Sequence, residues 1–434
     1  MRTHHHATPD EELISRIARR VMPMVVLVYL IAIIDRANVG FAKLQMVADL
    51  HMTEAGYGFA SSLFFLSYLL FEIPSTLAVS RFGARRWLAR IMLTWGLCTI
   101  LLGFNRTAGG FYVLRFLLGL AEAGAYPGLI FYISLWFPQS YRVRMMGVLT
   151  LGSAFGNMFG SLLGGPMLDM GGTFGLAGWQ WVFIATGLPA ILLCAALWFG
   201  LPDTPAQAKF LTDAERLQLQ AAMDREPPTD TAAHGNPLRL LWNRHVLLLA
   251  GLYTLILTSL YGVIYWLPTV VRGFHVSGTQ NGLISSIPWA VAATALFIIP
   301  RRLRQYRQTL RAICAIASVG VLSFAAAVLL PALWMRMLAL SVGTPCVSLL
   351  LPCFWSLPSR RFKGVQAAAA IGCISMLGNF GGFLAQNLMP LVSAATGSAG
   401  GAMLVPAVCL AAAALIALRM IVAGRRAEPE WRTT

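Results

Sequence analysis

The stretch of sequence that decides the fold is VMPMVVLVYLIAIIDRANVGFA, residues 21–42. It is almost continuously apolar, and a helix needs about 20 such residues to cross the roughly 30 Å hydrocarbon layer of a bilayer. Two charged side chains, Asp35 and Arg36, interrupt it. The stretch therefore predicts a transmembrane helix that carries two charges inside the membrane.

Eleven further runs of the same kind follow along the chain. Hydrophobic residues make up 57% of the 434 residues and charged residues only 12%, about half the charged share of a soluble protein. The runs are continuously apolar, whereas barrel strands would alternate with period two. We therefore expect an all-α integral membrane protein of twelve transmembrane helices, the other eleven at approximately 56–79, 87–104, 110–137, 144–168, 179–200, 245–271, 278–300, 309–330, 332–357, 365–392 and 397–423.

The basic residues test that count independently. Of 33 Lys and Arg residues, 27 lie in or beside the two chain ends and every second loop between them, and 4 lie in or beside the other loops. Loops rich in Lys and Arg stay in the cytoplasm, so both termini are expected to be cytoplasmic, in a multi-pass protein of a cell inner (plasma) membrane. The net charge of +16 is then explained by a basic rim facing anionic lipid, and no nucleic-acid partner is expected.

The longest polar stretch divides the chain in two. Residues 201–244 are expected to form a cytoplasmic linker, with a short surface helix at 214–224. Residues 1–200 would form one six-helix bundle with a cytoplasmic N-terminal tail, and 245–434 a second bundle with a cytoplasmic tail. The two bundles also resemble each other, because Ser153, Gly156 and Asn157 recur 222 positions later in the same order. Internal repeats of this kind are typical of secondary transporters, which hold their substrate between the halves.

Five ionisable side chains lie within the apolar runs. They are Asp35 and Arg36, Glu72, and Arg115 and Glu122. Charges are rare in membranes because burying them costs several kcal/mol unless they are paired or hydrated. Arginines can bind an anion through two parallel hydrogen bonds, and carboxylates can carry protons, because burial favours the neutral form while a nearby arginine favours the charged one. The alternative is that Asp35, Arg36, Arg115 and Glu122 form structural ion pairs between the first and fourth helices. For Glu72, near the end of the second run, a gating or structural role is as consistent with the sequence as proton transfer.

Neutral polar and aromatic side chains could complete a substrate pocket. Each of them could equally serve as an interhelical hydrogen-bonding group or as an anchor at the membrane interface. The candidates are Tyr68, Ser153, Asn157, Tyr261, Tyr265, Trp355 and Asn379.

Several separated segments resemble one known family. The chain is similar to the major facilitator superfamily and, within it, to the anion:cation symporters that include tartrate, phthalate, hexuronate and galactonate permeases. The segments that carry the resemblance are Asp35-Arg36-Ala37-Asn38-Val39-Gly40, Phe71-Glu72-Ile73-Pro74-Ser75, Arg81-Phe82-Gly83-Ala84-Arg85-Arg86-Trp87, Leu114-Arg115-Phe116, Glu122-Ala123-Gly124, Leu201-Pro202-Asp203-Thr204-Pro205 and Gly378-Asn379-Phe380-Gly381-Gly382-Phe383.

The resemblance implies roles for individual residues. Asp35 and Glu122 would handle protons, Arg36 and Arg115 would bind the anion, and Tyr68 and Asn379 would line the pocket. Glu72 and the loop residues Arg81, Gly83, Arg85 and Arg86 would belong to the cytoplasmic gate. This loop departs from the superfamily pattern, because Thr76 replaces a glycine and Ser80 replaces the aspartate that helps to latch the outward-open state.

The function that we expect is secondary active transport. The first hypothesis is proton-coupled uptake of a small organic anion, such as a sugar acid, a tartrate-like dicarboxylate or an aromatic carboxylate, by a monomer that needs no cofactor beyond the proton gradient. An anion exchanger or an efflux pump of the same fold is the alternative. A receptor or a membrane enzyme is a remote third, because no nucleophile–base pair or metal-ligand cluster is evident and no loop is large enough to house one.

Overall fold

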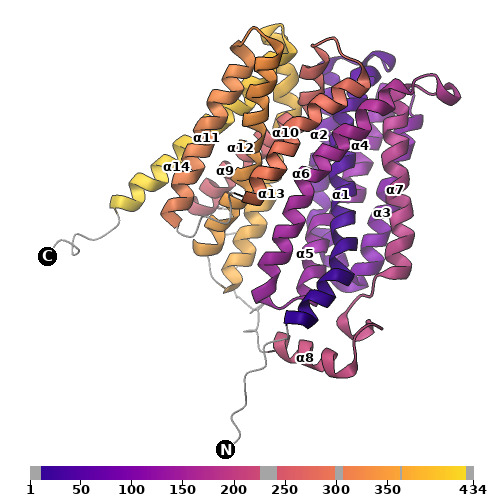
Figure 1. Cartoon of the computed structure of the whole chain (residues 1–434), viewed down its shortest axis with the longest axis vertical. Helices are drawn as coiled ribbons and strands as arrows, with labels where there is room; N and C mark the ends of the chain where they lie inside the picture. Colours follow the sequence, from indigo (N-terminus) through magenta and orange to yellow (C-terminus); the bar gives the residue numbers. More distant parts are fainter. Residues whose placement is uncertain (1–10, 225–241, 299–305, 362–363, 427–434) are drawn as a thin grey trace, which may run out of the picture.

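The computed structural model describes residues 11–224, 242–298, 306–361 and 364–426, and it is built from helices (Figure 1). The first half contains α1 (Glu11–Asp49), α2 (Glu54–Phe82), α3 (Ala84–Phe104), α4 (Ala108–Glu122), α5 (Ala125–Trp136), α6 (Gln139–Asp169) and α7 (Gly178–Gly200). The surface helix expected at 214–224 is α8 (Asp213–Asp224). The second half contains α9 (Arg244–Arg272), α10 (Gly278–Ile298), α11 (Tyr306–Leu329), α12 (Leu333–Arg361), α13 (Gly364–Thr396) and α14 (Leu404–Arg426).

The helices account for all twelve expected membrane runs. Within the described residues, eleven spans are long and apolar enough to cross a membrane, with α4 and α5 counted together. The remaining run, 365–392, lies in α13, a 33-residue helix packed against α9 and α2. The largest departures from the expected bounds are in the first and fourth runs. The fourth run breaks into α4 and α5, and α1 extends for 39 residues, beyond both ends of the predicted run.

The helices form two groups that lie side by side in Figure 1, α1–α7 on the right and α9–α14 on the left. Equivalent glycines bring helices together within each group. A β-carbon on Gly156 of α6 would lie 2.7 Å from the Ile33 side chain of α1, and one on Gly378, 222 positions later, would collide with Tyr253 of α9. Small residues let membrane helices pack closely, so the sequence repeat has a direct structural meaning.

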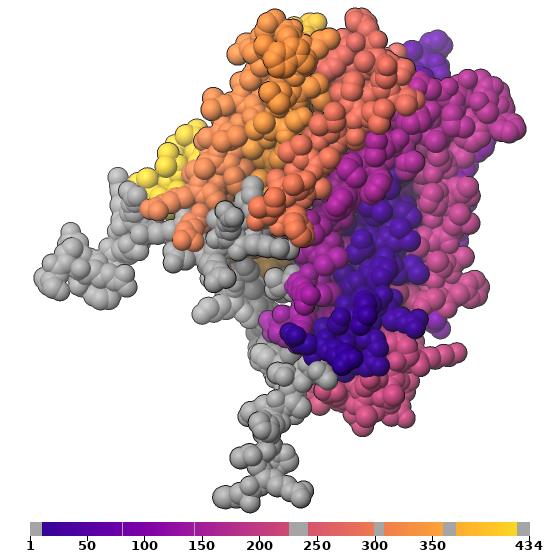
Figure 2. Space-filling view, viewed as in Figure 1, coloured from indigo at the N-terminus to yellow at the C-terminus, as the bar shows by residue number. Residues whose placement is uncertain are grey.

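The two groups meet along three helix pairs, α6 with α10, α2 with α13 and α1 with α9. The upper part of Figure 2 shows the α6 and α10 surfaces adjoining. Here the Asp169 carboxylate at the end of α6 accepts hydrogen bonds from the backbone N–H groups of Gly278 (2.9 Å) and Thr279 (2.7 Å). An acidic group at a helix N-terminus satisfies free N–H groups and favourably meets the helix dipole. A side chain of the first half thus caps a helix of the second.

The start of the linker is fixed to the first half. The Tyr132 hydroxyl of α5 donates to the Pro202 carbonyl (2.7 Å), and Trp136 stacks on Phe210 with ring centroids 6.0 Å apart. Arg16 of α1 forms an ion pair with Glu215 of α8. The linker therefore begins against the same end of the bundle at which α1 starts (Figure 1).

Candidate functional site

Arg36 lies at the centre of a cluster of charged and aromatic side chains between the two halves. Its Nε and Nη2 both donate to Glu122 Oε1, at 2.8 and 2.5 Å, which joins α1 to the end of α4. Its Nη1 donates to the Tyr261 hydroxyl of α9 at 3.1 Å. The guanidinium carbon is 5.3 Å from the Tyr68 ring centroid and 5.5 Å from that of Phe64. One arginine therefore contacts an acid of its own half and a hydroxyl of the other.

Glu122 is fully buried and is only half satisfied. Its Oε1 accepts both Arg36 hydrogen bonds, whereas Oε2 has no hydrogen-bond partner within the described part of the chain. Leaving a buried carboxylate oxygen unpaired is costly, so this atom is a natural position for a proton or for an incoming donor.

Helix α4 ends at Glu122, and the chain turns directly after it. Gly124 has φ +82°, and a β-carbon there would collide with the Ser75 side chain of α2. Only glycine adopts this conformation readily, so α4 ends and α5 begins in a new direction. Glu122 therefore sits at a helix end, next to the turn.

Arg115 is buried more deeply than Arg36, with only 1% of its surface exposed. Its Nη2 donates to the Ser61 carbonyl at 3.3 Å, and its guanidinium carbon lies 4.9 Å from the Phe64 ring centroid. Its Nε has no hydrogen-bond partner among the described residues. It forms no ion pair with Glu122, although the two share a face of α4. Phe64 thus lies beside both arginines, and Arg115 is a buried cation with unused hydrogen-bonding capacity.

Asp35 points away from this cluster. Its Oδ2 accepts a hydrogen bond of 2.8 Å from the indole N–H of Trp95 in α3, and the residue is 4% exposed. Adjacent residues on a helix diverge by about 100°, so Asp35 and Arg36 point in different directions. Asp35 is therefore a second buried acid, held inside the first half rather than beside the Arg36–Glu122 pair.

The second half contributes aromatic side chains to the Arg36 cluster. The rings of Tyr261 and Tyr265 in α9 lie 4.7 and 6.2 Å from the Phe65 ring of α2. The Tyr265 hydroxyl is buried without a hydrogen-bond partner in the described structure and interacts electrostatically with Arg115. Gly40 lets the backbone of α1 approach α9 closely beside Tyr265, because a β-carbon on Gly40 would lie 2.9 Å from the Tyr265 carbonyl oxygen.

The other predicted site residues lie in different surroundings. Glu72 of α2 and Asn379 of α13 lie close to each other across the halves. Ser153 and Asn157 instead bond within their own helix, to the carbonyls of Thr150 and Ser153. Trp355 packs edge-on against Tyr253 with ring centroids 4.9 Å apart. The structure therefore gives Ser153 a local hydrogen bond rather than a contact with the arginines.

The predicted gate loop is held by the linker. Arg85 donates its backbone N–H to Asp203 Oδ1 at 2.7 Å, and its Nε lies 3.4 Å from Oδ2. Gly83 turns at φ +89° between α2 and α3, where a β-carbon would lie 3.1 Å from the same carboxylate. Arg81 and Arg86 are exposed. Asp203 thus supplies an acidic partner to a loop that lacks the usual aspartate.

Lys43 is a charged residue of the site region that lies just beyond the predicted apolar run 21–42. It is 2% exposed and pairs with Glu54 at 2.7 Å. Its ammonium lies 3.3 Å from the Trp266 ring centroid and 3.4 Å from the Thr269 hydroxyl, both on α9. Lys43 follows Arg36 by seven residues, nearly two turns, so it shares the inward face of α1. That spacing is the signal that could have identified it.

The cluster defines what this region can do chemically. A carboxylate bound to an arginine can be replaced by an external carboxylate, provided that the displaced acid is neutralised or finds another partner. Within the described residues, no group of three His, Cys, Asp or Glu side chains could hold a metal ion. Buried charges between two packed helix bundles are typical of a membrane transporter.

Comparison with known proteins identifies the family. Residues 25–386 match the Major Facilitator Superfamily, and the chain belongs to it. A "Quinolone resistance transporter" of Acinetobacter baumannii is 38% identical over 90% of each chain. A protein of Agrobacterium vitis named as a tartrate transporter is 35% identical over 94% of this chain and 91% of its own. The inner membrane transport protein RhmT of Escherichia coli K12 is 33% identical over 85% and 86%.

Solved structures support the same fold. A bacterial homologue of the human lysosomal transporter Spinster superposes with a TM-score of 0.74 at 17% identity, over 96% of this chain and 98% of its own. A D-xylose–proton symporter gives 0.70 at 16% identity, over 91% and 96%. The expected superfamily and its all-helical membrane fold are thus confirmed, and the family and its relatives are transporters rather than enzymes.

Proposed function

We propose that this protein imports a small organic carboxylate together with a proton, by alternating access. The substrate would bind between the halves, on Arg36 and the aromatic side chains around it. Its class is suggested by the arginines and by the relative named as a tartrate transporter. We further propose that the protein acts as a monomer in a bacterial-type inner membrane, with both termini cytoplasmic and the proton gradient as its energy source.

The Arg36–Glu122 pair supplies the coupling. In the structure, Glu122 occupies the Nε–Nη2 edge of Arg36, which is the edge that a substrate carboxylate would bind through two parallel hydrogen bonds. Protonation of Glu122 removes its charge and frees that edge. Because the anion enters more easily when the proton is bound, the two move together.

Arg115 and Asp35 complete the proposed electrostatics. Arg115 is a buried cation with an unpaired Nε, so it would attract the second carboxylate or a hydroxyl of the substrate. Asp35, bound to Trp95, would be a second proton-carrying group that does not touch the substrate. Tyr68, Tyr261 and Tyr265 would contribute hydroxyls and ring faces.

The single observation that carries the proposal is the unpaired Oε2 of a buried glutamate whose other oxygen holds an arginine. The test is uptake of radiolabelled tartrate into proteoliposomes with an acidic exterior. We expect accumulation that collapses when a protonophore removes the gradient. Uptake that stays the same without a gradient would refute proton coupling. A thermal-shift screen with a carboxylate panel would extend the test to other substrates, because ligands that bind the folded state raise its melting temperature.

Export is the second candidate, favoured by the relative named as a quinolone resistance transporter. The same cluster would then exchange an outgoing substrate for incoming protons. Proteoliposomes separate the two directions. In an importer, an acidic exterior drives net entry of the carboxylate against its gradient, whereas in an exchanger the same gradient drives its exit from preloaded vesicles.

A further inference from the structure

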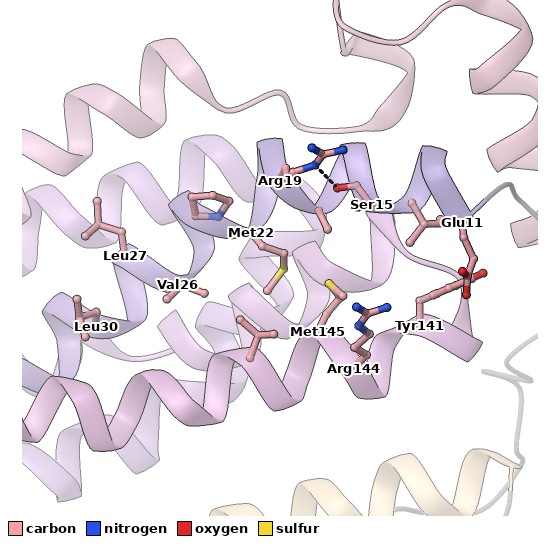
Figure 3. A pocket seen from close by; sticks show the side chains of 14 residues that line it. Glu11, Ser15, Arg19, Met22, Val26, Leu27, Leu30, Tyr141, Arg144 and Met145 are labelled. Carbon is pink, nitrogen blue, oxygen red and sulfur yellow. Dashed lines mark hydrogen bonds between the residues drawn. The ribbon is translucent and has the colours of Figure 1, made fainter. Parts of the chain in front are cut away.

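A groove outside the Arg36 cluster lies between α1 and α6, near the end of the bundle where α1 begins (Figure 3). Its cavity volume is about 620 Å³. Its deeper wall is apolar and is formed by Met22, Val26, Leu27, Leu30 and Val148. Its outer end is polar and carries Arg19, Arg144, Tyr141, Ser15 and Glu11. The groove is therefore amphipathic along its length.

The groove opens toward lipid rather than toward the centre of the protein. Leu27 and Val148, on its two walls, are each 41% exposed. Further along α6, Phe155 and Phe159 are both 42% exposed. Phe155 follows Val148 by seven residues and Phe159 follows Phe155 by four, so the three side chains lie on one face of the helix. A different face of α6 packs against α10, where Gly165 meets Gly278. The exposed face therefore looks outward, into the bilayer.

The dimensions fit one leaflet of a membrane. Arg19 and Leu30 are eleven residues apart on α1, a rise of about 16 Å, and half of a bilayer core is about 15 Å thick. A headgroup held at Arg19 would thus leave its acyl chain lying along the apolar wall as far as Leu30.

The charge at the polar end favours a phosphate. Arg19 donates one hydrogen bond, from Nε to the Ser15 carbonyl at 3.4 Å, and its Nη1 and Nη2 have no hydrogen-bond acceptor among the described residues. Arg144 has no carboxylate within ion-pair distance in the described part of the chain. Glu11 contributes one negative charge, so the three charged groups sum to a net positive charge. Arginine binds phosphate oxygens through charge-assisted hydrogen bonds.

We propose that this groove binds an anionic phospholipid, with the phosphodiester on Arg19 and Arg144 and one acyl chain between α1 and α6. Basic pockets between membrane helices are suited to such headgroups. The bound lipid would fill the space left where α1 and α6 diverge. This inference does not depend on the transported substrate, so it can fail or succeed independently of the proposed function.

The experiment measures lipid retention by native mass spectrometry of the purified full-length protein. The protein is exchanged into detergent with phosphatidylglycerol or phosphatidylcholine. We expect one phosphatidylglycerol to be retained, and Arg19→Gln and Arg144→Gln each to weaken retention about tenfold, as the loss of one charge-assisted hydrogen bond implies. Arg20→Gln is the matched control, because Arg20 is an exposed arginine of the same turn that does not line the groove.

Three results would overturn the proposal. Equal losses in the Arg20→Gln and Arg144→Gln proteins would mean that only surface charge is involved. Equal retention of phosphatidylcholine would mean that the anionic charge is not recognised. Displacement of the lipid by soluble sn-glycerol 3-phosphate at similar concentration would mean that the site binds free phosphate esters and not a membrane lipid.

Discussion

At the scale of single residues, the proposed chemistry depends on how the two oxygens of Glu122 differ. One oxygen accepts two hydrogen bonds from Arg36, and the other accepts none from the described residues. A neutral side chain of the same shape would keep part of the contact with Arg36 but could not gain or lose a proton. Coupling and binding should therefore be separable by substitution.

Glu122→Gln should uncouple transport. We expect gradient-driven accumulation of labelled tartrate in proteoliposomes to fall at least about tenfold, while exchange of internal for external tartrate continues. Asp213→Asn, an exposed surface change on α8, serves as the control. Accumulation by the Glu122→Gln protein at the wild-type level would exclude Glu122 as the coupling group.

Arg36→Lys and Arg115→Lys should both weaken substrate binding. Lysine keeps the charge but lacks the planar fork that binds a carboxylate through two hydrogen bonds. We expect the KM for tartrate to rise about tenfold or more in each variant, with the larger effect at Arg36 because its guanidinium holds both Glu122 and Tyr261. Normal transport kinetics in Arg115→Ala would show that Arg115 does not bind the anion.

The sequence marked four charged residues of the candidate site, but neither their partners nor Lys43. Burial cost alone marks Asp35, Arg36, Arg115 and Glu122 as unusual, and helix geometry separates the first two. Whether Glu122 pairs with Arg36 or with Arg115 depends on the packing of the surrounding helices, which places α1 near the end of α4. That packing is a tertiary property that periodicity does not encode.

At the scale of helices, the length of α1 changes the role of its last turns. The apolar run ends at residue 42, but the helix continues to Asp49 and carries Lys43 to the boundary between the halves. There the ammonium contacts Trp266 and Thr269 of α9 and pairs with Glu54 of α2. Hydropathy marks where a helix leaves the lipid rather than where it ends, which is why the apolar run 21–42 does not include Lys43.

Lys43→Met should loosen this end of the boundary. Methionine keeps an apolar stem but removes both the ion pair and the cation–π contact, and a desolvated cation–π contact contributes about 2 kcal/mol. We expect a cysteine placed at Thr269, in a background without the seven native cysteines, to react about tenfold faster with a membrane-impermeant thiol reagent. Arg106→Gln, an exposed change in the α3–α4 loop, should leave the rate unchanged. No change in the Lys43→Met protein would exclude a latching role.

At the scale of the whole molecule, described contacts tie the two halves together at one end. Asp169 caps α10, Arg272 donates to the Leu44 carbonyl, and Lys43 reaches α9. Alternating access requires such contacts to break when the halves rock. The division of the chain into two halves and a linker was predicted from composition and the 222-residue repeat. The contacts that join the halves at one end were not predicted, because they form between the ends of helices that are distant in sequence.

Locking this end should stop transport. Thr279 Oγ1 lies 2.7 Å from Asp169 Oδ2, so cysteines at these two positions are close enough to be cross-linked. In the same background without native cysteines, we expect oxidation of the Asp169→Cys/Thr279→Cys protein to abolish tartrate uptake and dithiothreitol to restore it. Each single variant should be insensitive to oxidant. Full activity in the cross-linked protein would mean that this end does not open during transport.

The break at Gly124 links the chemistry at the centre to the tether between the halves. Glu122 is the last residue of α4, and the next helix, α5, has only 12 residues. Near its C-terminal end, Tyr132 and Trp136 contact the start of the segment between the halves. A change in the backbone angles at Gly124 would reorient α5 relative to α4. Loss of charge on Glu122 would then displace the start of the segment that joins the halves.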